Sequence, residues 1–288
     1  MVTMVTASYY QQFDADFTLE YPSEGYGGWK KAALPVDTDK TALVVMHAWD
    51  AGTREEFPGW HRAVEYIPRA RQIADGVLKD LLAAARAHGF KIYHVVSDTV
   101  ADTVADGTYY AGLPGTKRAE DLAGQPAPAL PRIPADRTLR ERDAFKADYS
   151  FPGRRNKADV DRGFGRIGFI PSVRPLGAEP VVKNAGELFA VAAADGVNHL
   201  IYTGFAINYC LQYSPAGMAD MGRRGFQCSA VRQAVTAVER KESVRFEEHK
   251  ETALWMTAMM FGFVYDADDI FRMIKSLPAD NDLERDYF

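Results

Sequence analysis

The chain has 288 residues, of which 47% are hydrophobic and 25% charged, as is typical of a globular protein with a sizeable core. A net charge of -5 and the absence of basic runs argue against nucleic acid or an anionic membrane as a partner. Two cysteines are too few for a disulfide framework and suit a reducing cytoplasm. There is no signal-peptide pattern and no apolar run of 18 residues, so we expect a cytoplasmic protein without a spanning helix.

The chain divides into an N-terminal arm, residues 1–40, and a single domain, residues 41–288. The arm is rich in aromatic residues but lacks a clear periodicity. We expect it to pack on the domain or on a second subunit. The domain opens with a short apolar run, residues 41–46, which is typical of a strand buried on both faces.

The domain then alternates between helical and strand patterns. Gly89, Gly196 and Gly225 stand where helix C-caps belong. The sequence predicts helices at 67–88, 187–195 and 209–224, with strands at 90–96, 199–203 and 226–231. Pro215 should kink or break the third helix. Two more helices are expected within 248–277. Such alternation predicts an α/β fold with a mainly parallel sheet, whose ligands bind beyond the C-terminal ends of the strands.

Residues 99–165 interrupt this alternation with several prolines followed by a charged stretch. A loop-rich insertion of this length favours a lid or a subunit contact, and a solvated excursion is the alternative.

Cys210 is the most informative candidate residue. Gly204 ends a buried strand and frees the backbone to turn, which puts Cys210 at the start of the next helix. There the helix dipole and the backbone N–H groups favour a thiolate, lower its pKa and can stabilise an oxyanion. Cys228 lies in the middle of a predicted strand, where a cysteine usually fills space.

The stretch Thr203-Gly-Phe-Ala-Ile-Asn-Tyr-Cys210 resembles the signature of the isochorismatase-like cysteine hydrolases. The resemblance runs from about Thr41 to Lys275 and includes the segments 181–183, 219–225, 231–234, 242–243 and 261–264. It implies a three-layer αβα fold around a six-stranded parallel sheet. It also implies a cis peptide between Phe205 and Ala206, with an oxyanion hole made by the N–H groups of Ala206 and Cys210.

The catalytic triad of that family is Asp, Lys and Cys. By resemblance, Lys183 is the lysine, although the stretch from Lys183 to Cys210 is shorter than usual. An amine near the thiol would favour the thiolate.

The sequence departs from the family at the third member, because the first strand is followed by His47 instead of an acid. A histidine can take the thiol proton and return it to a leaving amine. Asp50, three residues later, or Asp98, after the second strand, are the alternatives. It is also possible that the base is lost and that His47 is a packed, buried histidine.

Zinc-containing relatives, the nicotinamidases, carry Asp-x-His after the second strand, whereas this chain has Asp98-Thr99-Val100. We therefore expect no metal and no cofactor. Aromatic residues near the strand ends are candidates for the walls of a pocket that binds a planar or heteroaromatic substrate; they are Trp49, Phe57, Trp60, Phe205 and Tyr209.

These features predict hydrolysis of a small amide or ureido C–N bond through a thioester. Two alternatives remain: a ligand-binding or assembly protein that has lost catalysis, and an enol-ether hydrolase of the isochorismatase type. We expect a small-molecule substrate and a homo-oligomer.

Overall fold

An eight-stranded sheet organises the molecule, which is described here from a computed structural model covering residues 1–96, 109–124, 134 and 136–279. The strand order is β2-β1-β10-β9-β8-β3-β5-β7. The strands are β1 (Val2–Gln11), β2 (Gly28–Asp37), β3 (Thr41–Met46), β5 (Lys91–Val95), β7 (Val181–Val182), β8 (His199–Phe205), β9 (Gln227–Thr236) and β10 (Val264–Tyr265). The six strands from β10 to β7 are all parallel, as predicted. A separate two-stranded sheet pairs β4 (Trp49–Asp50) with β6 (Gly168–Phe169).

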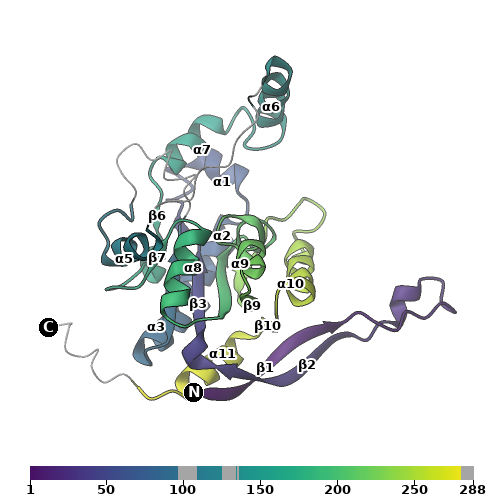
Figure 1. Cartoon of the computed structure of the whole chain (residues 1–288). Helices are drawn as coiled ribbons and strands as arrows, with labels where there is room; N and C mark the ends of the chain where they lie inside the picture. The colour runs from purple at the N-terminus through teal and green to yellow at the C-terminus, as the bar shows by residue number, and fades with distance from the viewer. Residues whose placement is uncertain (97–108, 125–133, 135, 280–288) are drawn as a thin grey trace.

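Helices cover both faces of this sheet (Figure 1). The α-helices are α1 (Pro58–Ala63), α2 (Ile67–Ile73), α3 (Lys79–Ala87), α5 (Pro114–Ala123), α6 (Arg137–Tyr149), α7 (Lys157–Phe164), α8 (Ala185–Ala194), α9 (Met218–Arg223), α10 (Glu248–Met260) and α11 (Ala267–Lys275). Two π-helical segments are η3 (Ala74–Leu78) and η5 (Ile207–Leu211). Short 3₁₀ turns are η1 (Pro22–Gly25), η2 (Thr38–Lys40) and η4 (Pro171–Val173).

The first parallel strand, β3, is buried along its whole length and contributes to two cores. Val44 and Met46 pack with α8, α9 and α10 on one face of the sheet. Leu43 and Val45 pack with α2, η3, α3 and α11 on the other face. Because successive side chains of a strand point to opposite faces, an uninterrupted apolar run is required here.

The N-terminal arm is a β-hairpin, which the sequence pattern did not predict. β1 and β2 pair along all ten residues of each strand. The hairpin joins the parallel sheet through the pair Ser8 and Val264, where β1 runs antiparallel to β10. Figure 1 shows the far end of the hairpin extending beyond the body of the protein.

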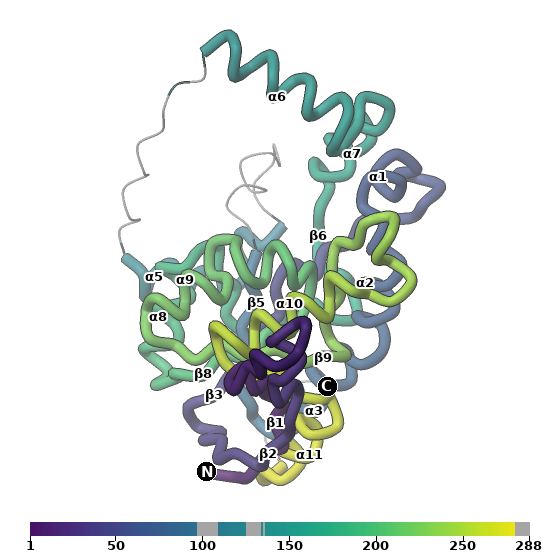
Figure 2. Tube along the Cα trace, turned by 90° about the vertical axis from the view of Figure 1, so that its right-hand side faces the viewer, coloured from purple at the N-terminus to yellow at the C-terminus, as the bar shows by residue number. Residues whose placement is uncertain are grey.

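The insertion is more helical than the sequence indicated. Its described part contains α5, α6 and α7. α7 packs with α1 through the cluster of Phe57, Trp60, Val160 and Ile167. α6 stands away from the body in both views (Figures 1 and 2).

One predicted helix needs correction. The expected helix 209–224 is not continuous: it consists of η5 and α9, separated by the turn around Pro215. Proline has no N–H and restricts the preceding residue, so the break falls where Pro215 predicted it. The segment 248–277 holds the two expected helices, and the short strand β10 lies between them. Within the described residues, no helix is long and apolar enough to cross a membrane.

Candidate active site

The candidate site lies where the chain reverses its direction of travel across the sheet. From β3 the chain moves through β5 to β7, and it then returns to form β8 on the opposite side of β3. Crossover connections therefore leave a crevice at the C-terminal ends of β3 and β8, the usual ligand site of such sheets. His47 follows β3, and Phe205 ends β8.

Gly204 allows these two strand ends to approach closely. Its partner in the register is Met46, and its φ of +106° favours glycine. A Cβ at this position would lie 2.1 Å from the Met46 carbonyl oxygen. The next peptide bond, between Phe205 and Ala206, is cis, as the resemblance implies.

Cys210 lies in η5, directly after this turn, and is partly buried. Burial raises the pKa of its thiol, while hydrogen bonds from the Ser214 hydroxyl and from the N–H groups of Ala206 and Cys210 oppose the rise. The predicted lowering of the thiol pKa is therefore wrong, because desolvation outweighs these donors. The two N–H groups expected to form the oxyanion hole nevertheless both favour the thiolate.

Lys183 follows β7 and is held by carboxylates. Its Nζ lies 2.7 Å from Glu120 Oε1 and 3.3 Å from Glu187 Oε1. Burial lowers the pKa of this amine, but the two carboxylates outweigh burial, so the pKa is raised. The predicted activation of Cys210 by this amine is not observed, since the thiol pKa is raised and the amine is paired elsewhere.

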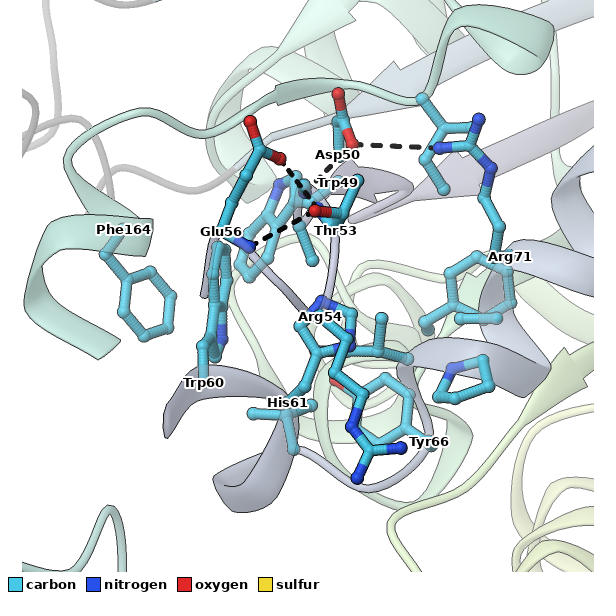
Figure 3. A pocket seen from close by; sticks show the side chains of 18 of the residues that line it. Trp49, Asp50, Thr53, Arg54, Glu56, Trp60, His61, Tyr66, Arg71 and Phe164 are labelled. Carbon is cyan, nitrogen blue, oxygen red and sulfur yellow. Dashed lines mark hydrogen bonds and ion pairs between the residues drawn. The ribbon is translucent and has the colours of Figure 1, made fainter. Parts of the chain in front are cut away.

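A cavity of about 610 Å³ occupies the crevice (Figure 3). Trp49, Trp60 and Phe164 lie together on one side of it, and Arg71 lies on the opposite side. The lining residues come from the loop after β3, from α1 and α2, from the end of the insertion and from β8. His47, Asp50, Tyr66, Arg166 and Phe205 are among them.

His47 is a buried imidazole whose two nitrogens have no hydrogen-bond partner among the described residues. Its ring stacks on Trp49, and its φ of +51° places it in the left-handed region. Burial lowers the pKa of His47 to about 3, so the ring is neutral at pH 7. It can donate one hydrogen bond and accept another.

The resting site therefore contains a neutral thiol and a neutral imidazole. Burial raises the pKa of the Cys210 thiol and lowers the pKa of His47 to about 3, so transfer of the proton from sulfur to imidazole is unfavourable at rest. No Cys–His ion pair forms at rest.

Asp50 lines the cavity but is surrounded by positive charge. Its carboxylate lies 3.7 Å from Arg71 and 3.7 Å from Arg166, and it accepts the Gly52 N–H at 3.0 Å. These contacts favour a role in fixing the loop over one as proton acceptor.

The other predicted positions fall in different places. Tyr209 is 60% exposed and is not among the residues that line the cavity, so the prediction that it forms a pocket wall is not supported. Phe57 is buried in the cluster between α1 and α7 and is likewise not a lining residue. Cys228 is fully buried in β9. Asp98 lies outside the described residues.

Several lining residues were not anticipated from the sequence. Tyr66 lines the cavity, and burial together with the charge of a Cys210 thiolate raises the pKa of its phenol. Cys210 itself is not among the residues that line the cavity. His61 also lines the cavity, with a buried Nε2 that has no partner among the described residues. Arg54, Arg71 and Arg166 supply three cations against the two acids Asp50 and Glu56. The predicted residues that do line the cavity are His47, Trp49, Asp50, Trp60 and Phe205, whose sequence signal was their position near a strand end.

No group of three or more His, Cys, Asp or Glu side chains that could hold a metal occurs in the described part of the chain.

Solved structures similar to this chain were found at low identity. A cysteine hydrolase from Pseudomonas syringae pv. phaseolicola matches 84% of this chain and 96% of its own, with 18% identity and a TM-score of 0.45. An isochorismatase family protein from Burkholderia thailandensis matches 82% and 96%, with 14% identity and a TM-score of 0.46. The YcaC gene product of Escherichia coli, an octameric hydrolase of unknown specificity, matches 82% and 79%, with 13% identity and a TM-score of 0.41.

Two of these structures carry the names of the family that the sequence resembles. No family model matches the chain, and no curated protein does.

Proposed function

We propose that this protein is a cysteine-dependent hydrolase of a small-molecule amide or ureido C–N bond. The observation that carries the proposal is the position of Cys210 in η5, directly after the Gly204 turn and the cis peptide between Phe205 and Ala206. The N–H groups of Ala206 and Cys210 oppose the rise in the thiol pKa, and donors in this position stabilise negative charge on sulfur and then on the oxygen of an attacked carbonyl. Tyr66 lines the cavity, and the charge of a Cys210 thiolate raises the pKa of its phenol, which supports coupling between the cavity and the thiol.

In this mechanism the Cys210 sulfur forms a bond to the substrate carbonyl carbon while its proton passes to His47. The tetrahedral species then breaks its C–N bond, and His47 returns the proton to the departing amine. Water attacks the resulting thioester, releases the acid and restores the thiol. Because the thiol pKa is raised and the pKa of His47 is about 3, the proton moves to His47 only as the bond between sulfur and carbon forms.

The cavity also favours a class of substrate. Aromatic walls suit a planar group. Three arginines against two acids favour a substrate with one negative charge over a cation. We therefore propose a planar amide or ureido compound that carries a carboxylate.

The test is a panel of carboxylate-bearing aromatic amides and ureido acids, with ammonia release as the readout. We expect turnover of at least one compound, and loss of that turnover in Cys210→Ala. Cys228→Ala is the matched control and should retain it. Hydroxylamine should trap the acyl group as a hydroxamate in the wild type. Unchanged turnover in Cys210→Ala would exclude the mechanism.

A second candidate is a binding protein that has the fold without the catalysis. The raised thiol pKa and the pairing of Lys183 with two carboxylates favour it. It predicts that a compound of the same panel raises the melting temperature and is recovered unchanged. Release of ammonia from the bound compound would exclude it.

A further inference from the structure

The far end of the N-terminal hairpin projects from the body and packs on no other element among the described residues. We call residues 12–27, between β1 and β2, the arm tip. The hydrogen bonds of its loop lie within it, among them Asp16 N–H to the Pro22 carbonyl at 2.9 Å and Thr18 Oγ1 to Asp16 at 2.7 Å. Three of its aromatic or aliphatic side chains are more than half exposed: Phe13 at 56%, Phe17 at 86% and Tyr21 at 61%. Fixed, exposed aromatic side chains on a projecting arm indicate a contact surface.

A second projecting element has the same property. We call residues 137–156, which comprise α6 and the loop that joins it to α7, the α6 segment. α6 contains no buried residue. Phe145 is 66% exposed, Tyr149 68% and Phe151 54%. A helix of 13 residues with no packed face is marginal in water, so this helix needs a partner to be stable.

The two elements carry opposite charge. The arm tip has four acidic residues and no basic one. The α6 segment has six basic and three acidic residues, a net charge of +3. Two of those acids are already paired, Glu141 with Arg137 and Asp148 with Arg154. Arg142, Lys146 and Arg155 have no carboxylate within ion-pair distance among the described residues.

Within one chain these elements do not meet. Both views show α6 beyond one end of the body and the hairpin at a different side of it (Figures 1 and 2). The free edge of β2 is a poor alternative contact, because Pro35 and the pair Lys30 and Lys31 interrupt it.

We propose that the arm tip of one copy of this chain binds the α6 segment of a second copy. The contact is reciprocal, as in a two-fold dimer, so each copy supplies one arm tip and one α6 segment. The aromatic side chains of the two elements form the apolar centre, and the acidic tip pairs with the basic helix around it. Because α6 belongs to the insertion that also supplies Phe164 to the cavity, the dimer contact and the cavity are built partly from the same segment of the chain.

The decisive test uses charge reversal and sedimentation of purified full-length chains. Glu20→Lys with Glu24→Lys reverses part of the arm tip, and Arg142→Glu with Lys146→Glu reverses part of the α6 segment. We expect the wild type to dimerise and each variant alone to dimerise at least about tenfold more weakly, the effect of roughly 1.4 kcal/mol. In an equimolar mixture, the new lysines in the arm tip of one variant face the new glutamates in the α6 segment of the other, and the second contact has its wild-type residues. Heterodimers should therefore form at about the wild-type affinity.

A matched pair of apolar variants tests the aromatic part. Phe145 and Met260 are both 66% exposed. Phe145→Asp should weaken the dimer, while Met260→Asp on α10 should leave it intact. Circular dichroism checks that every variant is folded. The proposal is overturned by a monomeric wild type, by reversed variants that dimerise as well as the wild type, or by a mixture that fails to restore association.

Discussion

The imidazole of His47 stacks on the indole of Trp49, with ring centroids 4.4 Å apart and planes inclined by 16°. This contact holds the imidazole at the end of β3 with neither nitrogen bonded to another described residue. A position that commonly carries an acid in the resembled family is therefore filled by a neutral, buried ring. Because burial lowers the pKa of this ring to about 3, the ionisation of His47 is linked to folding.

His47→Asn should reduce the loss of stability on acidification. The pKa of His47 is about 3 in the folded chain and 6.5 ordinarily, so only the unfolded chain binds this proton between those values. Above pH 6.5 this group therefore does not reduce the free energy of unfolding. As the pH falls toward 3, it lowers the free energy of unfolding, by about 2 kcal/mol between pH 6.5 and 5. Asparagine tolerates the positive φ and removes this proton. Urea unfolding at the two pH values measures the difference, and identical slopes in wild type and variant would refute the assignment.

Cys210 should react slowly with iodoacetamide at neutral pH. Burial raises the pKa of its thiol, so less thiolate is present at pH 7 than in a free cysteine. The alkylation rate should be below that of a free thiol at pH 7 and should still be rising at pH 9. Mass spectrometry of the wild type and Cys210→Ser identifies the modified residue. Cys228 is fully buried and should remain unmodified in both. Fast alkylation at pH 6 would show that the thiol is activated in solution.

Gly204→Ala should unfold or strongly destabilise the chain. The added Cβ would lie 2.1 Å from the Met46 carbonyl oxygen and 2.9 Å from the Met46 nitrogen, which are backbone atoms of a buried strand. Steric overlap and the positive φ together should cost about 3 kcal/mol or more. Gly196→Ala is the control, since it also has a positive φ but nothing within 4 Å of a new Cβ. It should cost only about 1 kcal/mol in chemical denaturation; equal losses in the two variants would contradict the close approach of β3 and β8.

Lys183→Met should cost about 1–3 kcal/mol of stability, because it removes a cation from the nearly buried carboxylate of Glu187. Lys117→Met is the control. It breaks a pair with Asp121 in which both side chains are more than 60% exposed, and such pairs contribute about 0–1 kcal/mol. Urea denaturation of both variants at pH 7 gives the comparison. If the two losses are the same, the Lys183 pair does not stabilise the fold more than a surface pair does.

The parallel core was predictable because its signals are local and periodic. The apolar run of β3 and the glycine stops before β5, β8 and β9 fix the alternation of helix and strand. The hairpin was missed because its burial pattern alternates only weakly: β1 packs one short stretch around Ala7 and Ser8 against the body. A strand whose two faces are both partly covered has little reason to alternate.

The site was predictable in position but not in electrostatics. The turn at Gly204 located Cys210, and the strand end located His47. The pKa of each depends on desolvation by segments distant in sequence, such as the loop that brings Tyr66 near the thiol. The pairing of Lys183 with Glu120 depends likewise on α5, which belongs to the insertion. Neither contact leaves a signal in local sequence.

The hairpin also has a practical consequence for producing this protein. β10 would be the outermost strand of the parallel sheet if β1 did not pair with it through Ser8. An uncovered strand of this kind is a template for pairing between molecules and a route to aggregation. A version trimmed to residues 38–288 is thus expected to accumulate in inclusion bodies, whereas shortening the loop between β1 and β2 preserves the cover and should keep the yield.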